Sequence, residues 1–289
     1  MQSKKLHPQG PEFSRVIAGA WRWHNVSQGT VERLIQTALD EGITTFDHAD
    51  IYGDHSNEEI FGKVIQKNPS LREKMQLVSK CGIKFKSEKR PATLIKHYDT
   101  TKKHIIGSVE NSLKMLATDR LDLMLIHRPD PLLNPTEVAE AFTQLKEQGK
   151  VLHVGVSNFT PSQYRMLQHH LDFPLVTNQI EISLSRVVSF FNGDLDILLE
   201  HEASAMAWSP LGGGKLMMGD REWFAKASKY NASYAQLSLA WLMKHPIIFP
   251  VVGTTKPDRI TEAAKSVSIE LDRQDWFEML QWVRGEEVP

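Results

Sequence analysis

The chain alternates between short apolar runs and longer amphipathic stretches. The apolar runs span four to six residues and end at polar or glycine-containing segments, as is typical of strands in a buried parallel sheet. The amphipathic stretches place apolar residues three or four positions apart, which predicts helices with one buried face. Eight strands are predicted in this way, at 15–18, 43–46, 76–80, 121–126, 151–156, 175–180, 205–208 and 247–252.

A helix is predicted after each strand. Gly42 and Gly149 follow two of these helices as stop signals, and Pro135 and Pro161 stand in the first turn of two others. The eight helices are predicted at 30–39, 56–65, 105–116 and 135–148, from 160 onward, and at 196–200, 234–243 and 256–264. A further C-terminal helix is predicted at 276–283.

Eight strand–helix units predict an α/β fold of the (β/α)₈ TIM barrel type with an extra C-terminal helix. The alternative is an open, doubly wound sheet, which usually has a glycine-rich first turn. The chain contains no G-x-G-x-x-G and no P-loop pattern, so the barrel is favoured. No composition break or low-complexity linker interrupts the alternation, and a single domain over 1–289 is therefore predicted.

Composition and charge limit the classes of partner that the chain is expected to bind. The chain is 41% hydrophobic and 24% charged, with a formal net charge of -1, so no nucleic-acid or membrane partner is indicated. Cys81 is the single cysteine, which excludes an internal disulfide and a multi-cysteine metal site, and no metal is expected. No apolar run approaches the roughly 20 residues of a membrane span. We therefore expect a cytoplasmic protein with a small-molecule substrate; no pattern in the chain indicates an oligomeric state.

Four residues whose side chains could take part in catalysis lie at or just past the ends of three consecutive predicted strands. Asp47 follows the second strand, Lys80 ends the third and His127 follows the fourth, while Tyr52 lies in the loop after Asp47. Active sites of such barrels lie at the carboxyl ends of the strands, so these side chains are expected to converge. Alone, Asp47, Tyr52 and His127 each have a simpler explanation as a capping or loop residue, a turn aromatic or a core histidine. Lys80 is more informative, because lysine rarely ends a buried strand without a partner. Together they favour one shared site.

The four side chains suit the protonation of a carbonyl oxygen. A phenol titrates near pH 10 and donates poorly at neutral pH unless a cation stabilises its anion, and Lys80 can supply that cation. Asp47 can hold the ammonium, and His127 can orient and polarise a carbonyl. Because no side chain delivers hydride, a nicotinamide cofactor is implied.

These motifs resemble those of the aldo-keto reductases over nearly the whole chain, from 17 to about 264. The family's D-x-A-x-x-Y pattern is similar to Asp47-His48-Ala49-Asp50-Ile51-Tyr52, and its strand-end lysine and histidine match Lys80 and His127. The segment 155–159 matches a further family signature. The resemblance implies an NADP(H)-dependent reductase of aldehydes or ketones with Tyr52 as proton donor, assisted by Asp47, Lys80 and His127. It also implies that the nicotinamide is held by Ser157, Asn158, Gln179 and Trp208.

Two loops indicate a phosphate site on their own evidence. Barrels often bind phosphate with the loops after strands seven and eight. The first loop brings glycines that let backbone approach a pyrophosphate, in Ser209, Pro210, Leu211, Gly212, Gly213, Gly214 and Lys215. The second opens a helix and adds charge suited to a 2′-phosphate, which favours NADP, in Gly253, Thr254, Lys256 and Arg259. Each loop alone is a weak signal.

One position departs from the family pattern. Where many members have Glu-Asn to hold the adenine, this chain has Glu262-Ala263, so Glu262 is kept and the asparagine contact is missing. Ala20 and Trp21, just past the first strand, are further candidates for cofactor contact. Trp21 and Trp23 are candidates for a substrate wall, and a packing cluster at the rim is the alternative for both.

Two other functions remain open at this point. A lysine that ends a barrel strand can act as a nucleophile, so a Schiff-base aldolase using Lys80 is one alternative. A cofactor-binding regulatory subunit with weak reductase activity is the other. The long loop from 81 to 100 is rich in lysine and arginine and matches no ligand pattern.

Overall fold

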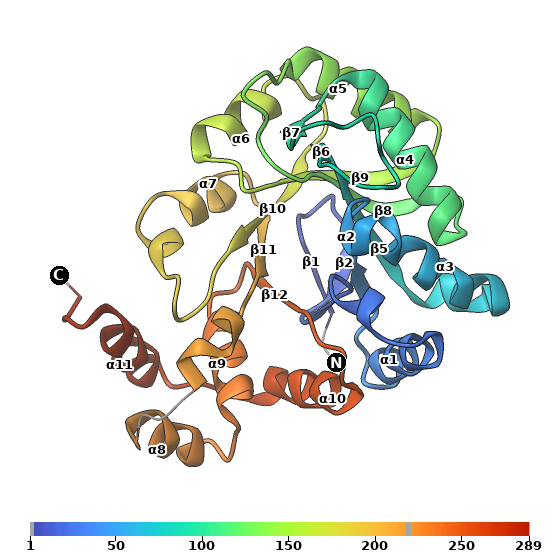
Figure 1. Ribbon diagram of the computed structural model, residues 1–289. Helices are drawn as coiled ribbons and strands as arrows, with labels where there is room; N and C mark the ends of the chain where they lie inside the picture. The colour runs from blue at the N-terminus through green and yellow to red at the C-terminus, as the bar shows by residue number, and fades with distance from the viewer. Residues whose placement is uncertain (1–2, 218–220, 289) are drawn as a thin grey trace.

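The computed structural model describes residues 3–217 and 221–288. Eight parallel strands form a closed barrel, as predicted, with helices around it (Figure 1). Neighbouring strands follow the chain order, and the last pairs with the first. The barrel strands are β3 (Ile17–Gly19), β4 (Thr45–Asp47), β5 (Gln76–Cys81), β8 (Leu121–Ile126), β9 (Val151–Ser157), β10 (Leu175–Glu181), β11 (Ser204–Trp208) and β12 (Ile248–Val252).

Several of the outer helices begin directly after a residue whose side chain caps them. Ser27, Thr101, Thr160 and Ser233 each accept a hydrogen bond from a backbone N–H of the first turn, which satisfies a donor that the helix itself cannot. The outer helices of the barrel are α1 (Gln28–Asp40), α3 (Asn57–Lys67), α4 (Lys102–Leu116), α5 (Pro135–Glu147), α6 (Pro161–Gln168), α7 (Asp194–Glu200), α9 (Tyr234–Met243) and α10 (Pro257–Lys265). Two more lie beyond the barrel alternation, α8 (Arg221–Lys229), which was not predicted, and the predicted C-terminal α11 (Arg273–Arg284).

Successive side chains of each strand point to opposite sides, and this produces two apolar layers. On β8, Leu123 and Leu125 point into the barrel, while Met124 and Ile126 pack against the helices. All four are fully buried, so β8 reads as a continuous apolar run rather than an alternating one. This burial on both faces is why the barrel strands were recognisable from sequence.

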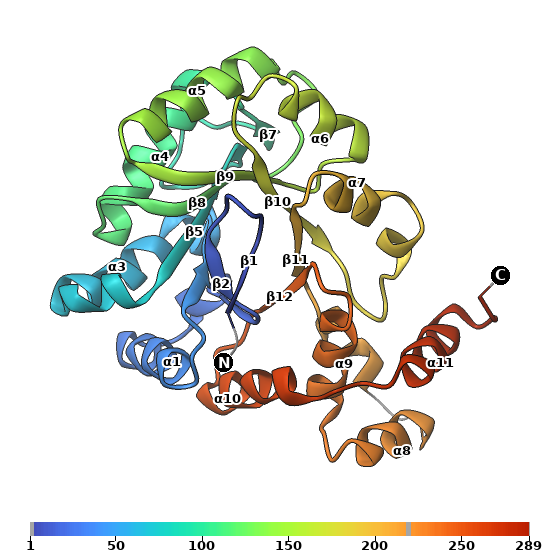
Figure 2. The same cartoon turned by 180° about the vertical axis from the view of Figure 1, so that it is seen from behind.

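An antiparallel hairpin that was not predicted crosses the N-terminal end of the barrel (Figure 2). It consists of β1 (Ser3–Lys5) and β2 (Glu12–Ser14), and its Leu6 and Phe13 join the inner apolar layer. The hydroxyl of Ser204 on β11 donates to the carbonyl of Leu6 at 2.7 Å. The hairpin therefore closes this end, and the carboxyl ends of the strands remain as the accessible face.

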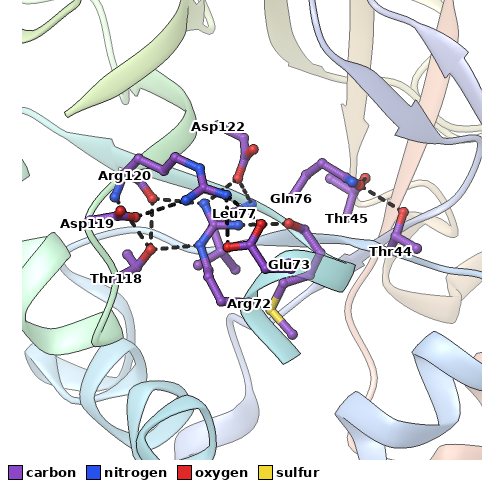
Figure 3. A network of polar contacts seen from close by, with 11 residues as sticks. Thr44, Thr45, Arg72, Glu73, Gln76, Leu77, Thr118, Asp119, Arg120 and Asp122 are labelled. Atoms are coloured by element: carbon purple, nitrogen blue, oxygen red, sulfur yellow. Dashed lines mark hydrogen bonds and ion pairs between the residues drawn. The ribbon is translucent and has the colours of Figure 1, made fainter. Parts of the chain in front are cut away.

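A polar network also lies at the N-terminal ends of β5 and β8 (Figure 3). The Arg72 guanidinium forms an ion pair with Asp122 at 2.8 Å and donates to the Thr118 hydroxyl at 2.7 Å and the carbonyl of Met75 at 2.8 Å. The same Asp122 oxygen accepts from the Leu77 N–H at 2.8 Å. One buried ion pair thereby joins the segment before β5 to both strands.

On the opposite face, the lysine-rich loop contains a second small hairpin. It is formed by β6 (Ile83–Lys84) and β7 (His97–Tyr98), where the sequence predicted only a polar loop. Figure 1 shows it over the rim near β8 and β9. Within the described residues, no helix has the length and apolarity needed to cross a bilayer.

Candidate active site

The ends of β4, β5 and β8 bring three of the four candidate residues together. These strands are direct neighbours in the barrel, and Asp47 is the last residue of β4. The Lys80 ammonium lies 2.8 Å from both carboxylate oxygens of Asp47 and also donates to the carbonyl of His48. Lys80 is fully buried, and Asp47 is 3% exposed. The pair is thus a charge-assisted contact inside the protein, with geometry that compensates for the loss of water.

Tyr52 lies above this ion pair. It is the first residue of the short helix α2 (Tyr52–His55), and the Lys80 ammonium lies 4.8 Å from the centre of its ring. The His127 ring meets it edge-on, with ring centres 5.8 Å apart. Gly53 follows with φ +59°, and a Cβ there would come within 2.6 Å of His24. The turn that positions the phenol therefore requires glycine at this position.

The protonation states follow from burial and from Lys80. Burial alone would lower the pKa of Lys80, but Asp47 and Tyr52 outweigh it and raise that pKa. Burial raises the pKa of Tyr52, and the charge of Lys80 offsets only part of this rise. The cation that the sequence predicted to stabilise the phenolate therefore does not bring this pKa below its usual value. Burial and the charge of Lys80 hold the pKa of His127 well below its usual range. At neutral pH the site combines an ammonium, a neutral phenol and a neutral imidazole.

Behind the ion pair lies a layer of buried carboxyls that sequence reasoning missed. Glu58 of α3 is 3% exposed and accepts a hydrogen bond from Ser79, the neighbour of Lys80 on β5. Asp50 accepts from the Ser108 hydroxyl at 2.8 Å, and its other oxygen is enclosed with no hydrogen-bond donor among the described residues. Burial and the nearby Glu58 raise the pKa of Asp50 to about 8. Asp50 lies within the D-x-A-x-x-Y pattern, but only the position of Ser108 on α4 shows that it points away from the rim.

The candidates for nicotinamide contact form a connected group at the ends of β9, β10 and β11. The Ser157 hydroxyl donates to the carbonyl of Gln179 at 2.8 Å and accepts from the Asn158 amide at 2.7 Å. The Asn158 amide oxygen accepts from the Trp208 indole at 3.0 Å. The Gln179 amide donates to Asp47 at 2.9 Å, which links this group to the ion pair. The structure therefore brings these residues next to the four catalytic candidates.

Two features fit a phosphate-bearing cofactor. Gly212, Gly213 and Gly214 all have φ between +55° and +81°, and a Cβ on Gly213 or Gly214 would meet no atom within 4 Å, so backbone there is open to a ligand. Lys256 is the N-cap of α10 and makes no side-chain capping hydrogen bond. Pro257 has no N–H, and the N–H groups of Lys256 and Arg259 are bonded to Thr254 and Lys256, so the Asp258 N–H and the positive end of the helix remain for an anion. The Lys256 and Arg259 side chains are exposed at this end.

The remaining candidates differ in their surroundings. Trp23 is only 2% exposed, packs on Phe61 with ring centres 6.0 Å apart, and donates to the carbonyl of Thr254 at 2.9 Å. This favours the packing alternative for Trp23, whereas Trp21 is 54% exposed and stays available to a ligand. Glu262 accepts from the Ser233 hydroxyl. The side chain of Lys215 lies outside the described part of the structure.

The remaining backbone candidates lie on the same rim. Ala20 is 1% exposed, and its N–H donates to the carbonyl of Asp47 at 2.9 Å. The residues Ser209, Pro210 and Leu211 follow β11 directly, and Gly253 follows β12. Ser209 has φ +50°, a left-handed conformation that turns the chain sharply after Trp208. The loops named from sequence thus begin at neighbouring strand ends.

Comparison with known proteins places the chain among oxidoreductases. A family model described as Aldo/keto reductase family matches residues 15–282. An uncharacterized oxidoreductase, YcsN, of Bacillus subtilis is 45% identical over 96% of this chain and 97% of its own length. A 6-dehydroglucose reductase of Agrobacterium fabrum is 43% identical over 96% of both chains.

A solved structure agrees with this comparison. The crystal structure of a thermostable aldo-keto reductase, solved with an inhibitor, superimposes with a TM-score of 0.84 and 25% sequence identity. The match covers 98% of this chain and 100% of that one.

Proposed function

The chain belongs to the aldo/keto reductase family, and from this premise we propose that it is an NADPH-dependent reductase of aldehydes or ketones. The observation that carries the proposal is the buried Lys80 ammonium, held by Asp47 at 2.8 Å and 4.8 Å from the centre of the Tyr52 ring. Relatives named as reductases of 6-dehydroglucose support reduction as the reaction.

Tyr52 is the proposed proton donor to the carbonyl oxygen. Its raised pKa keeps the phenol protonated at neutral pH, and the adjacent ammonium stabilises the phenolate left after donation. His127, neutral because its pKa is lowered, can donate a hydrogen bond to the same oxygen and orient it. The hydride for the carbonyl carbon would come from NADPH held by the rim residues described next.

The proposed cofactor contacts are those of the rim. Ser157, Asn158 and Gln179 offer amide and hydroxyl groups for the carboxamide, and Trp208 offers a flat indole face. The glycine loop and the N-terminus of α10 suit the phosphates. Ala20, Trp21 and Glu262 complete the proposed set.

The aldolase alternative fits less well. A Schiff-base lysine must lose its proton before it attacks a carbonyl, and such lysines have lowered pKa values. Lys80 instead has a raised pKa and an ion-pair partner. The regulatory alternative uses the same cofactor site, and it differs from the reductase only in the rate at which the carbonyl is reduced.

Replacing Tyr52 tests the catalytic role. We expect Tyr52→Phe to lower kcat for aldehyde reduction by about 100-fold to 10,000-fold, because a positioned general acid contributes that much. The dissociation constant for NADPH, measured by quenching of tryptophan fluorescence, should stay close to that of the wild type. Near-normal turnover by Tyr52→Phe would refute the assignment, and tight NADPH binding with negligible turnover in the wild type would favour the regulatory alternative.

Replacing Arg259 tests the cofactor preference. A guanidinium that contacts a 2′-phosphate makes charge-assisted hydrogen bonds that NADH cannot form. We expect Arg259→Gln to weaken NADPH binding about 10-fold and to leave NADH binding unchanged, as measured by the same fluorescence titration. Equal wild-type affinities for the two cofactors would contradict the role given to Lys256 and Arg259.

A further inference from the structure

Arg128 directly follows His127 at the carboxyl end of β8. Its side chain is half-buried, and the guanidinium carbon lies 5.5 Å from the centre of the Trp208 ring. Among the residues that the structure describes, no carboxylate pairs with this guanidinium. Its N–H donors are therefore free to bind another group beside the catalytic candidates.

The loop between β6 and β7 adds positive charge on the same rim. It carries Lys86, Lys89, Arg90 and Lys96 against one acid, Glu88, and within the described chain none of the four cations forms an ion pair. After burial and Lys80, the charges on Arg128 and Lys96 also lower the pKa of His127. The positive charge of this loop thus affects the protonation of the proposed catalytic imidazole of His127.

The acids nearest to these cations in the chain are engaged elsewhere. Asp130 accepts from the Thr100 hydroxyl at 3.0 Å and from the Leu132 N–H at 2.8 Å. Asp99 pairs with Lys84 at 3.3 Å. The Thr100–Asp130 bond also joins the segment that follows β7 to the loop that carries Arg128. Arg128, Lys86 and Lys96 therefore have no ion-pair partner among the described residues, whereas Glu59 and Asp50 lie close enough to Lys89 and Arg90 for their charges to interact.

The same rim exposes large apolar side chains. Leu94 is 79% exposed and Ile95 is 72% exposed on the basic loop, Leu132 is 89% exposed after β8, and Trp21 is 54% exposed after β3. Exposed apolar groups on the loops that also carry unpaired cations suit a ligand with an apolar body and an anionic end.

We propose that the substrate is an aldehyde or ketone that carries a carboxylate at the end remote from its carbonyl, and that Arg128 binds this carboxylate. The inference rests on the proposed reductase function and adds a substrate class to it. The planar guanidinium can donate two parallel N–H bonds to a carboxylate, and a neutral group of the same shape leaves its charge uncompensated. The cations of the loop add long-range attraction for anions.

A matched pair of aldehydes tests the proposal. We compare kcat/KM for 4-carboxybenzaldehyde with that for 4-formylbenzamide, which has nearly the same shape and no charge. With NADPH, the ratio should be at least about 10 in the wild type and close to 1 in Arg128→Gln, because a charge-assisted contact is worth about one order of magnitude or more. Arg128→Lys should fall between them. Arg33→Gln, an exposed arginine of α1, is the matched control and should keep the wild-type ratio.

A binding measurement decides the contact without turnover. Calorimetric titration with 4-(hydroxymethyl)benzoate should show about 10-fold weaker binding to Arg128→Gln than to the wild type or to Arg33→Gln. Equal rates for the two aldehydes in the wild type, or an unchanged ratio in Arg128→Gln, would overturn the proposal. If the wild type reduces neither aldehyde, the reductase function fails for this class. The titration then still decides whether Arg128 binds the anion, and equal binding by all variants would overturn it.

Discussion

At the residue scale, Lys80 determines the electrostatics of the site. Its ammonium pairs with the carboxylate of Asp47, offsets part of the rise that burial causes in the pKa of Tyr52, and adds to burial in lowering the pKa of His127. All three effects depend on burial, because the same charges at an exposed position would be screened by water. A substitution of Lys80 therefore changes three groups at once, and its effect on rate is not that of one contact.

Asp50 predicts how stability depends on pH. Its pKa is raised from 3.8 to about 8 in the folded protein, so the fold binds a proton there that the unfolded chain has released. The stabilisation of the folded state by this bound proton is fully present below about pH 4 and is lost as the pH rises to about 8. Between pH 6 and pH 9, we expect the wild type to lose about 2–3 kcal/mol more unfolding free energy than Asp50→Asn.

Urea denaturation at the two pH values measures this difference. Asp54→Asn, an exposed aspartate in the same turn, is the control and should follow the wild type. The prediction fails if wild type and Asp50→Asn lose the same stability over this range.

At the element scale, the ion pair between Arg72 and Asp122 joins η2 (Pro69–Lys74) to β5 and β8. Arg72→Met should lower the free energy of unfolding by about 3–5 kcal/mol, because it leaves the half-buried Asp122 carboxylate without its counter-charge and removes the guanidinium donors to the carbonyls of Met75 and Arg120. Lys67→Met breaks the exposed pair with Glu32 and should cost less than about 1 kcal/mol. The network lies at the barrel end opposite the active site, so turnover of the folded Arg72→Met enzyme should be unchanged. A matching loss of kcat would contradict that separation.

The elements also show where sequence reasoning succeeds. Strand β8 and helix α9 have the predicted bounds, because β8 is a buried apolar run and α9 begins at a capping serine. The hairpins β1–β2 and β6–β7 were missed. Their strands have two or three residues and several charged side chains, so they carry no detectable alternation. Tertiary contacts rather than local pattern determine those strands.

At the scale of the whole molecule, closure of the barrel explains why the candidate site was largely predictable. Residues at the carboxyl ends of adjacent parallel strands must meet, so Asp47, Lys80 and His127 follow from strand order alone. The enclosed Asp50 and the unpaired Arg128 do not follow from it. Their surroundings depend on which side chains of α4, β11 and the loop between β6 and β7 face them. The spacing of residues along the chain does not predict those contacts.

The hairpin at the barrel's N-terminal end has a consequence for the order of events during synthesis. Residues 3–14 are made early, but their partners Ser204 and Pro246 follow 198 and 242 residues later. Leu6 and Phe13 have no barrel interior to enter until β11 and β12 have left the ribosome, so their apolar surface needs protection for nearly the whole time of translation. Leu6 and Phe13 are thus expected to reach their native contacts only after β11 and β12 have been translated.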